Sequence, residues 1–171
     1  MEQTNLFETP PPGDTLAEAR AMFFTGLREG DRPDCACCQR DGHIDHRKLN
    51  SAMAIGLAFF YHQRGNGSGG YAHMHDQPPK ARAARDTSRL KHWGMLEPSS
   101  HQPGDDDKRT SGMWRITTKG VAFVEHRLVV PRVKHVFDDR VLYVSEETTD
   151  MAAALGDDYN YLEVLHGVLP W

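Results

Sequence analysis

One apolar segment, followed by a glycine-rich run, constrains the fold of this chain more than any other feature. Residues 47–64 carry six large apolar side chains, and residues 65–70 read GNGSGG. Apolar positions that cover a broad face over this length favour a helix packed against a core, and consecutive glycines end such a helix. We therefore predict a helix over residues 47–64.

The size and composition favour one domain. The chain has 171 residues, 39% of them apolar, which is enough for one domain with a real core. Fifteen glycines and ten prolines indicate many turns. The sequence has no apolar run long enough to span a membrane, and its first residues do not resemble a signal peptide. We expect a cytoplasmic protein that does not bind membranes.

The pattern of caps, breakers and alternating residues predicts an α+β fold. Thr15 and Glu18 match a capping box, so a helix is expected over 15–29, and Gly94 is expected to end a second helix. Pro78 and Pro79 are expected to exclude a helix before that one. The other predicted elements are a helix over 81–93, strands over 95–97 and 113–117, a helix over 119–127, a hairpin over 134–144 that turns at 138–139, and short helical segments over 149–156 and 159–168.

The charges are distributed unevenly along the chain, although the formal net charge is only −4. Residues 80–92 hold five basic residues and one acid, whereas residues 138–171 hold eight acids and one arginine. A basic segment of this kind is either a solvated helix face or a contact surface for phosphates. The acidic end is either a solvated surface or a protein-docking surface, since tyrosine, leucine and tryptophan lie among its acids.

Part of the chain resembles a winged helix-turn-helix domain. In that family the third helix ends in a glycine followed by a short strand, a loop called the wing, and a strand that runs into a Thr-x-x-Gly helix start. Here RLKHWGMLEP, a polar loop over 99–112 and GMWRITTKGVAFV follow that order, and residues 47–127 carry the match. The chain also looks like a group of small phage-encoded proteins of unassigned function.

The resemblance divides the chain into four parts. Residues 1–14 would be a flexible arm, 15–46 an N-terminal helix with a Cys/His segment, and 47–127 the winged-helix-like domain. Residues 128–171 would be an acidic tail, made of a hairpin and short helices, packed on the same core.

The resemblance also implies a set of DNA-contacting residues. The third helix of such domains usually enters the major groove, and lysine and arginine neutralise the phosphates. The residues placed near DNA are Lys80, Arg82, Arg85, Ser88, Arg89 and Lys91 around that helix, and Lys108, Arg109 and Arg115 in and beside the wing. The wing also contains three consecutive acids at 105–107, which would repel phosphate.

The segment DCACCQRDGHIDH, residues 34–46, is a candidate zinc site. Cys35 and Cys38 have the spacing of a tight turn that directs two thiolates at one ion, and His43 with His46 could complete a set of four ligands. The three-residue step between the histidines suits one turn of helix. Cys37 would then be a bystander or a substitute ligand.

Other interpretations of this segment stay open. His73 and His75, two residues apart in an extended segment, are alternative ligands. The cysteines could also be an unliganded turn or a redox pair. A zinc site closed by four ligands would be structural, and only Asp45 is placed to act as a base in a catalytic one.

The sequence as a whole predicts a non-enzymatic DNA-binding protein, a phage-type transcriptional or DNA-processing regulator, which could act as a homodimer on double-stranded DNA. The alternative is a protein-interaction module that inhibits or redirects a host protein through its acidic C-terminal surface. No motif typical of a hydrolase, kinase or metalloprotease is present.

Overall fold

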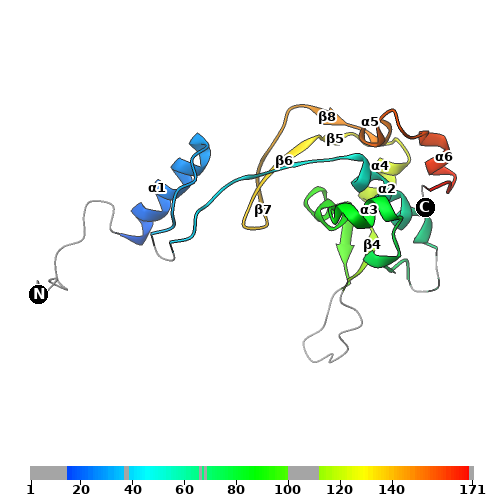
Figure 1. Ribbon diagram of the computed structural model, residues 1–171, viewed down its shortest axis with the longest axis horizontal. Helices are drawn as coiled ribbons and strands as arrows, with labels where there is room; N and C mark the ends of the chain where they lie inside the picture. The colour runs from blue at the N-terminus through cyan, green and yellow to red at the C-terminus, as the bar shows by residue number, and fades with distance from the viewer. Residues whose placement is uncertain (1–14, 37–38, 66, 68, 100–111, 170–171) are drawn as a thin grey trace, which may run out of the picture.

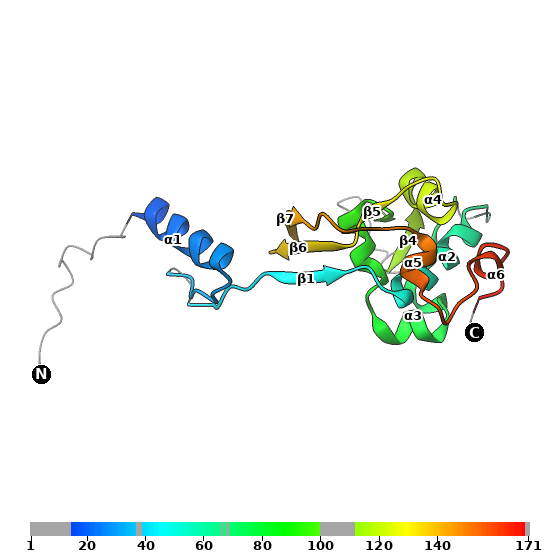
Figure 2. The same cartoon turned by 90° about the horizontal axis from the view of Figure 1, so that it is seen from above.

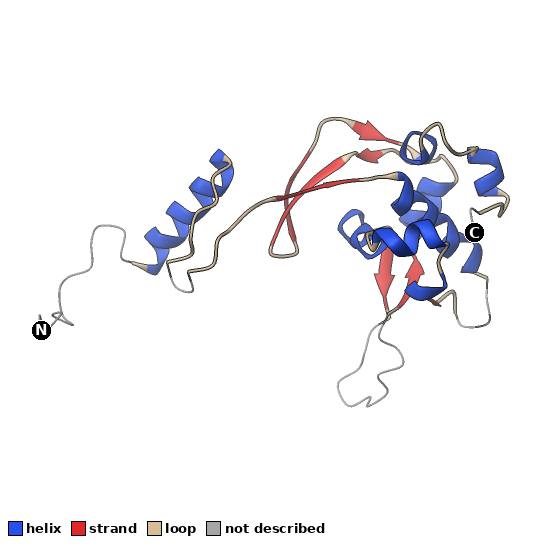
Figure 3. Cartoon of the chain, viewed as in Figure 1, coloured by secondary structure: helices blue, strands red, loops and turns tan. Residues whose placement is uncertain are grey.

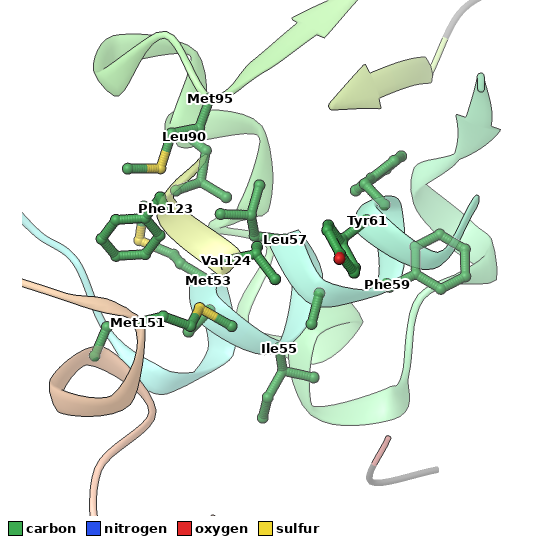
Figure 4. Close-up of a cluster of buried hydrophobic side chains, with 14 of the residues drawn as sticks. Met53, Ile55, Leu57, Phe59, Tyr61, Leu90, Met95, Phe123, Val124 and Met151 are labelled. Carbon is green, nitrogen blue, oxygen red and sulfur yellow. The ribbon is translucent and has the colours of Figure 1, made fainter. Parts of the chain in front are cut away.

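Helix α2 (Ser51–Gln63) runs through the core of the protein, and the computed structural model describes it together with residues 15–36, 39–65, 67, 69–99 and 112–169. Every residue from 52 to 61 is buried, so α2 is apolar around its whole circumference, as expected for a central helix. In Figure 4 the side chains of other elements gather around it, among them Leu90, Phe123 and Met151.

The predicted helix over 47–64 was too long at its start. The side chain of Asn50 accepts a hydrogen bond from the backbone N–H of Met53 and caps α2. Residues Asp45–Lys48 instead form strand β1, which pairs antiparallel with strand β6 (Val133–Phe137). Because the partner strand lies far along the chain, the local pattern could not reveal this pairing.

The helices and strands form an α+β fold, as the sequence predicted (Figure 3). The remaining helices are α1 (Leu16–Glu29), η1 (Met74–Asp76), α3 (Pro79–Ala84), η2 (Thr87–Trp93), α4 (Thr118–Val124), α5 (Met151–Leu155) and α6 (Tyr161–Leu165), of which η1 and η2 are 3₁₀ helices. The remaining strands are β2 (Ala72–His73), β3 (Leu96–Pro98), β4 (Met113–Ile116), β5 (Val130–Pro131), β7 (Arg140–Val144) and β8 (Thr148–Thr149).

The strands form two three-stranded antiparallel sheets and one two-stranded ladder. One sheet has the order β2-β4-β3, with Ala72 opposite Trp114 and Leu96 opposite Ile116. The other has the order β1-β6-β7, and β5 pairs with β8. The first sheet lies beside the helical core, and the second extends away from it as an arm (Figure 1).

The predicted helix over 81–93 is broken in two. Helix α3 ends at Ala84, Arg85 adopts a left-handed conformation with φ 55° and ψ 20°, and η2 begins at Thr87. The expectation that the prolines exclude a helix was also wrong, since α3 begins at Pro79, where the missing N–H has no intrahelical partner to lose. The predicted stop at Gly94 is confirmed by its left-handed backbone.

Helix α1 lies apart from the core, at the end of the arm (Figure 2). Its predicted capping box is present between Thr15 and Glu18, and Gly30 ends it. The rings of Phe23 and Phe24 meet Phe137 at the tip of β6, with ring centroids 5.5 and 5.9 Å apart. These aromatic contacts hold α1 against the arm sheet.

The predicted hairpin over 134–144 is confirmed as β6 and β7. Asp138 and Asp139 form its turn, and both have positive φ, a conformation that Asp tolerates better than most residues. The pairing of the two strands is irregular between His135 and Val136, and Leu142 is the extra residue of the resulting bulge. The helices α5 and α6 that follow contribute Met151, Leu155 and Val164 to the same core as α2.

Candidate functional site

The structure brings three of the predicted DNA-contacting residues to one cavity. A cavity of about 660 Å³ lies along η1, α3 and the start of η2, and Arg82, Arg85 and Ser88 line it. Arg82 and Arg85 are exposed, and Ser88 is half-buried. The other lining residues are Met74, His75, Gln77, Pro79, Ala81, Ala83 and Thr87.

Arg82 and Arg85 have no acidic partner among the described residues, and unlike Lys80 they make no contact there with a tyrosine hydroxyl or ring. The one side-chain hydrogen bond of Arg82 within the described residues is a long one of 3.4 Å, donated by Nη1 to the carbonyl oxygen of His75. Their charges are therefore available to an anion from outside.

The other predicted basic residues are already engaged. Arg89 pairs with Asp86 at 2.5 Å and Lys91 with Asp139 at 2.6 Å. Lys80 donates a hydrogen bond to the Tyr159 hydroxyl at 2.5 Å and lies over the same ring. Each of these contacts weakens the attraction between the cation and a phosphate.

The wing residues of the prediction are less well placed. Arg115 on β4 pairs with Glu97 of β3 at 2.5 Å, and this contact raises the pKa of the guanidinium. Lys108 and Arg109, together with the acids at 105–107, lie outside the described residues. The described site is thus centred on α3 and η2.

The inner wall of the cavity holds two polar residues that the sequence analysis missed. Gln77 and Thr87 are 4% and 2% exposed, and the side-chain oxygen of each is buried without a hydrogen-bond partner among the described residues. Both oxygens face Gly56 of α2. The Gln77 amide nitrogen donates to the Met74 carbonyl oxygen at 2.9 Å, which fixes its oxygen toward the helix. Nothing in the local sequence around these residues signals such an arrangement.

A second polar cluster lies across the arm sheet. The ring of His135 on β6 stacks on Tyr143 of β7 with centroids 4.1 Å apart, and the ring of His46 on β1 meets it edge-on at 4.6 Å. Burial, and to a smaller extent the neighbouring His46, lowers the pKa of His135. His135 is therefore neutral at neutral pH, where its ring packs on Tyr143.

Burial also affects the groups behind η2. It lowers the pKa of His92, although Asp139 acts in the opposite direction. The ammonium of Lys134 donates to the His92 carbonyl oxygen at 2.6 Å and lies over the Trp93 ring, and burial lowers its pKa. These contacts tie η2 to the arm sheet.

The predicted zinc ligands are not gathered into one cluster in the part of the chain that the structure describes. The prediction that His43 and His46 share one turn of helix is wrong, because strand β1 begins at Asp45. His43 instead lies 3.2 Å from the Asp45 carboxylate, and His46 contacts His135. Cys35 is half-buried, and Cys37 and Cys38 lie outside the described residues. Over the described ranges, no group of three or more His, Cys, Asp or Glu side chains could hold a metal ion.

The alternative histidine pair does come together. His73 on β2 and His75 on η1 stack their rings with centroids 5.0 Å apart, and the His75 N–H donates to Nδ1 of His73. The stacking and this backbone contact account for their proximity without a metal.

Comparisons with family models, with curated proteins and with solved structures each returned no match. None of the described helices combines the length and apolar character needed to cross a membrane.

Proposed function

We propose that this protein binds double-stranded DNA with the face formed by α3 and η2, as a non-enzymatic regulator of the phage type. The observation that carries the proposal is the pair of exposed arginines, Arg82 and Arg85, with no acid paired to them among the described residues. A guanidinium binds a phosphate with two parallel hydrogen bonds and can also recognise a guanine edge.

The order of elements supports this proposal. Two short helices, α3 and η2, follow α2, and Gly94 ends η2 directly before β3. The chain returns from β3 as β4, which leads into α4 through the N-cap Thr117. This is the succession of helix, glycine, strand, loop, strand and Thr-capped helix on which the winged-helix resemblance rests.

The engaged cations limit the affinity that one copy can reach. Each phosphate neutralised contributes about −0.9 to the slope of log K against log salt, so two free arginines give a shallow salt dependence. Two copies on one duplex would double the number of contacts, and a homodimer is therefore part of the proposal.

Duplex binding measured against salt concentration tests the proposal. Replacing Arg82→Ala with Arg85→Ala should weaken binding at about 50 mM salt by at least tenfold and reduce the slope by about two. The matched control is Arg20→Ala with Arg127→Ala, which removes the same charge from α1 and from the turn that follows α4. Equal binding by the two double variants would contradict the proposal.

A second function is favoured by one observation at the other end of the chain. Leu162 and Val168 are 59% and 61% exposed and lie among the acids Asp157, Asp158 and Glu163. Exposed apolar side chains close in sequence to several acids suit a basic protein partner, such as a host protein that the chain inhibits or redirects. Leu162→Lys with Val168→Lys should abolish capture of such a partner, and retention of the partner would exclude this surface.

Structural zinc at Cys35 and Cys38, completed by His43 and His46 or by other histidines, stays a prediction. Elemental analysis of the purified chain beside Cys35→Ser tests it. One zinc per chain that is lost in the variant would support the site.

A further inference from the structure

The cavity along α3 has the size and lining of a small-molecule site. Its volume of about 660 Å³ lies within the range of roughly 300–1,000 Å³ that is common for ligand pockets. Met74, Pro79, Ala81 and Ala83 supply an apolar surface, while two guanidinium groups and Ser88 supply polar contacts. A ligand that matches this lining has an apolar body and an anionic group.

The backbone at the cavity's edge is held in a costly conformation. Arg85 has a positive φ of 55°, which is unusual for a residue with a long side chain. Such conformations cost of order 1–3 kcal/mol and cluster at ligand-binding sites. Here the left-handed turn separates α3 from η2 and places Arg85 on the cavity lining.

The inner wall of the cavity is closed by buried side chains. Thr87 and Gln77 line the cavity, but their side-chain oxygens face Gly56 of α2 and are buried away from a ligand. The polar side chains open to a ligand are therefore those of Arg82, Arg85 and Ser88.

We propose that the cavity lined by Arg82, Arg85 and Ser88 binds an organic phosphate of nucleotide size, with the phosphate on the two arginines and the apolar body on Met74, Pro79 and Ala83. A bound ligand occupies the same guanidinium groups that the proposed DNA contact uses. The regulatory part of this inference, in which the ligand displaces DNA, rests on the proposed function. Ligand binding itself does not.

Calorimetry of the full-length protein without DNA tests the site. The probe is adenosine 5′-monophosphate, compared with adenosine, which lacks the anion, and with inorganic phosphate, which lacks the apolar body. We expect the nucleotide to bind at least tenfold more tightly than either fragment. Absence of nucleotide binding at millimolar concentration, or equal binding of adenosine, would overturn the proposal.

Two variants locate the binding. Arg82→Ala with Arg85→Ala should weaken nucleotide binding at least tenfold, whereas Arg20→Ala with Arg127→Ala should leave it unchanged. Unchanged affinity in the arginine variant would overturn the site.

Displacement of DNA is measured separately. Addition of the nucleotide should lower duplex binding in proportion to its occupancy. If the nucleotide binds and the duplex does not, the site stands and the DNA-binding proposal fails. If the duplex binds and the nucleotide does not, the cavity proposal fails alone.

Discussion

The ammonium of Lys91 at the end of η2 lies 2.6 Å from a carboxylate oxygen of Asp139 in the turn between β6 and β7. The hydrogen bond from Lys91 holds the pKa of Asp139 below its usual range, so the acid stays charged at neutral pH. The pair joins the basic segment to the arm sheet. It also removes one positive charge from the proposed DNA-binding face.

Removing this acid should strengthen DNA binding. Asp139→Asn keeps a side chain that tolerates the positive φ of this position and frees Lys91 for a phosphate. We expect severalfold tighter duplex binding at low salt and a salt slope steeper by about 0.9. Asp138→Asn is the control, because Asp138 shares the turn and the positive φ but makes no ion pair with the described residues. Equal effects of the two changes would attribute the gain to net charge.

A glycine at position 85 should separate folding from binding. Arg85→Gly relieves the left-handed backbone, and we expect a gain of about 0.5–1 kcal/mol in the free energy of unfolding, since the relief of strain exceeds the added freedom of the unfolded chain. Duplex binding should weaken at the same time, because a guanidinium is lost. Arg85→Ala loses the charge without the relief. Chemical denaturation and duplex titration measure both effects, and a destabilised Arg85→Gly would contradict the account of the break.

The same break shows where sequence-based prediction fails for this chain. The capping box of α1, the stop at Gly94 and the turn at Asp138 are local devices, and local sequence identifies them. The end of α3 at Ala84 is different. The buried Thr87 and Leu90 pack η2 against α2, which lies far from η2 in the sequence. In the sequence, the spacing of apolar residues that is typical of a helix continues through residue 85, although α3 ends at Ala84.

The candidate site was only partly predicted, for a similar reason. The basic residues were visible in the sequence, but the acids that pair with Lys91 and Arg115 come from the turn between β6 and β7 and from β3. The cavity itself depends on Gln77 and Thr87, whose position over Gly56 is set by tertiary packing. No spacing in the sequence brings those three residues together.

Position 56 should therefore be intolerant of even a small side chain. A Cβ on Gly56 would collide with the Thr87 side chain and with the Gln77 side-chain oxygen. Gly56→Ala gains helix propensity but overpacks this contact, and we expect a net loss of about 1–3 kcal/mol in the free energy of unfolding. Combining it with Thr87→Ala should recover part of the loss, since both the hydroxyl and the methyl that meet the new Cβ are removed. A stabilised Gly56→Ala would show that the Thr87 and Gln77 side chains move aside without cost, which would contradict this prediction.

Acidification should destabilise the fold through two histidines that pack without charge. Burial lowers the pKa of His92 and of His135 in the folded protein, so the unfolded chain, with histidine near 6.5, takes up protons first as the pH falls. The stability they contribute is complete above about pH 6.5 and is lost as the pH falls toward their folded pKa values. The thermal midpoint should drop between pH 7 and pH 5, and His92→Gln with His135→Gln should flatten that drop. His166→Gln, at an exposed position, is the control for replacing a histidine as such. A double variant as acid-sensitive as wild type would place the origin of the pH dependence elsewhere, in the carboxylates of the ion pairs.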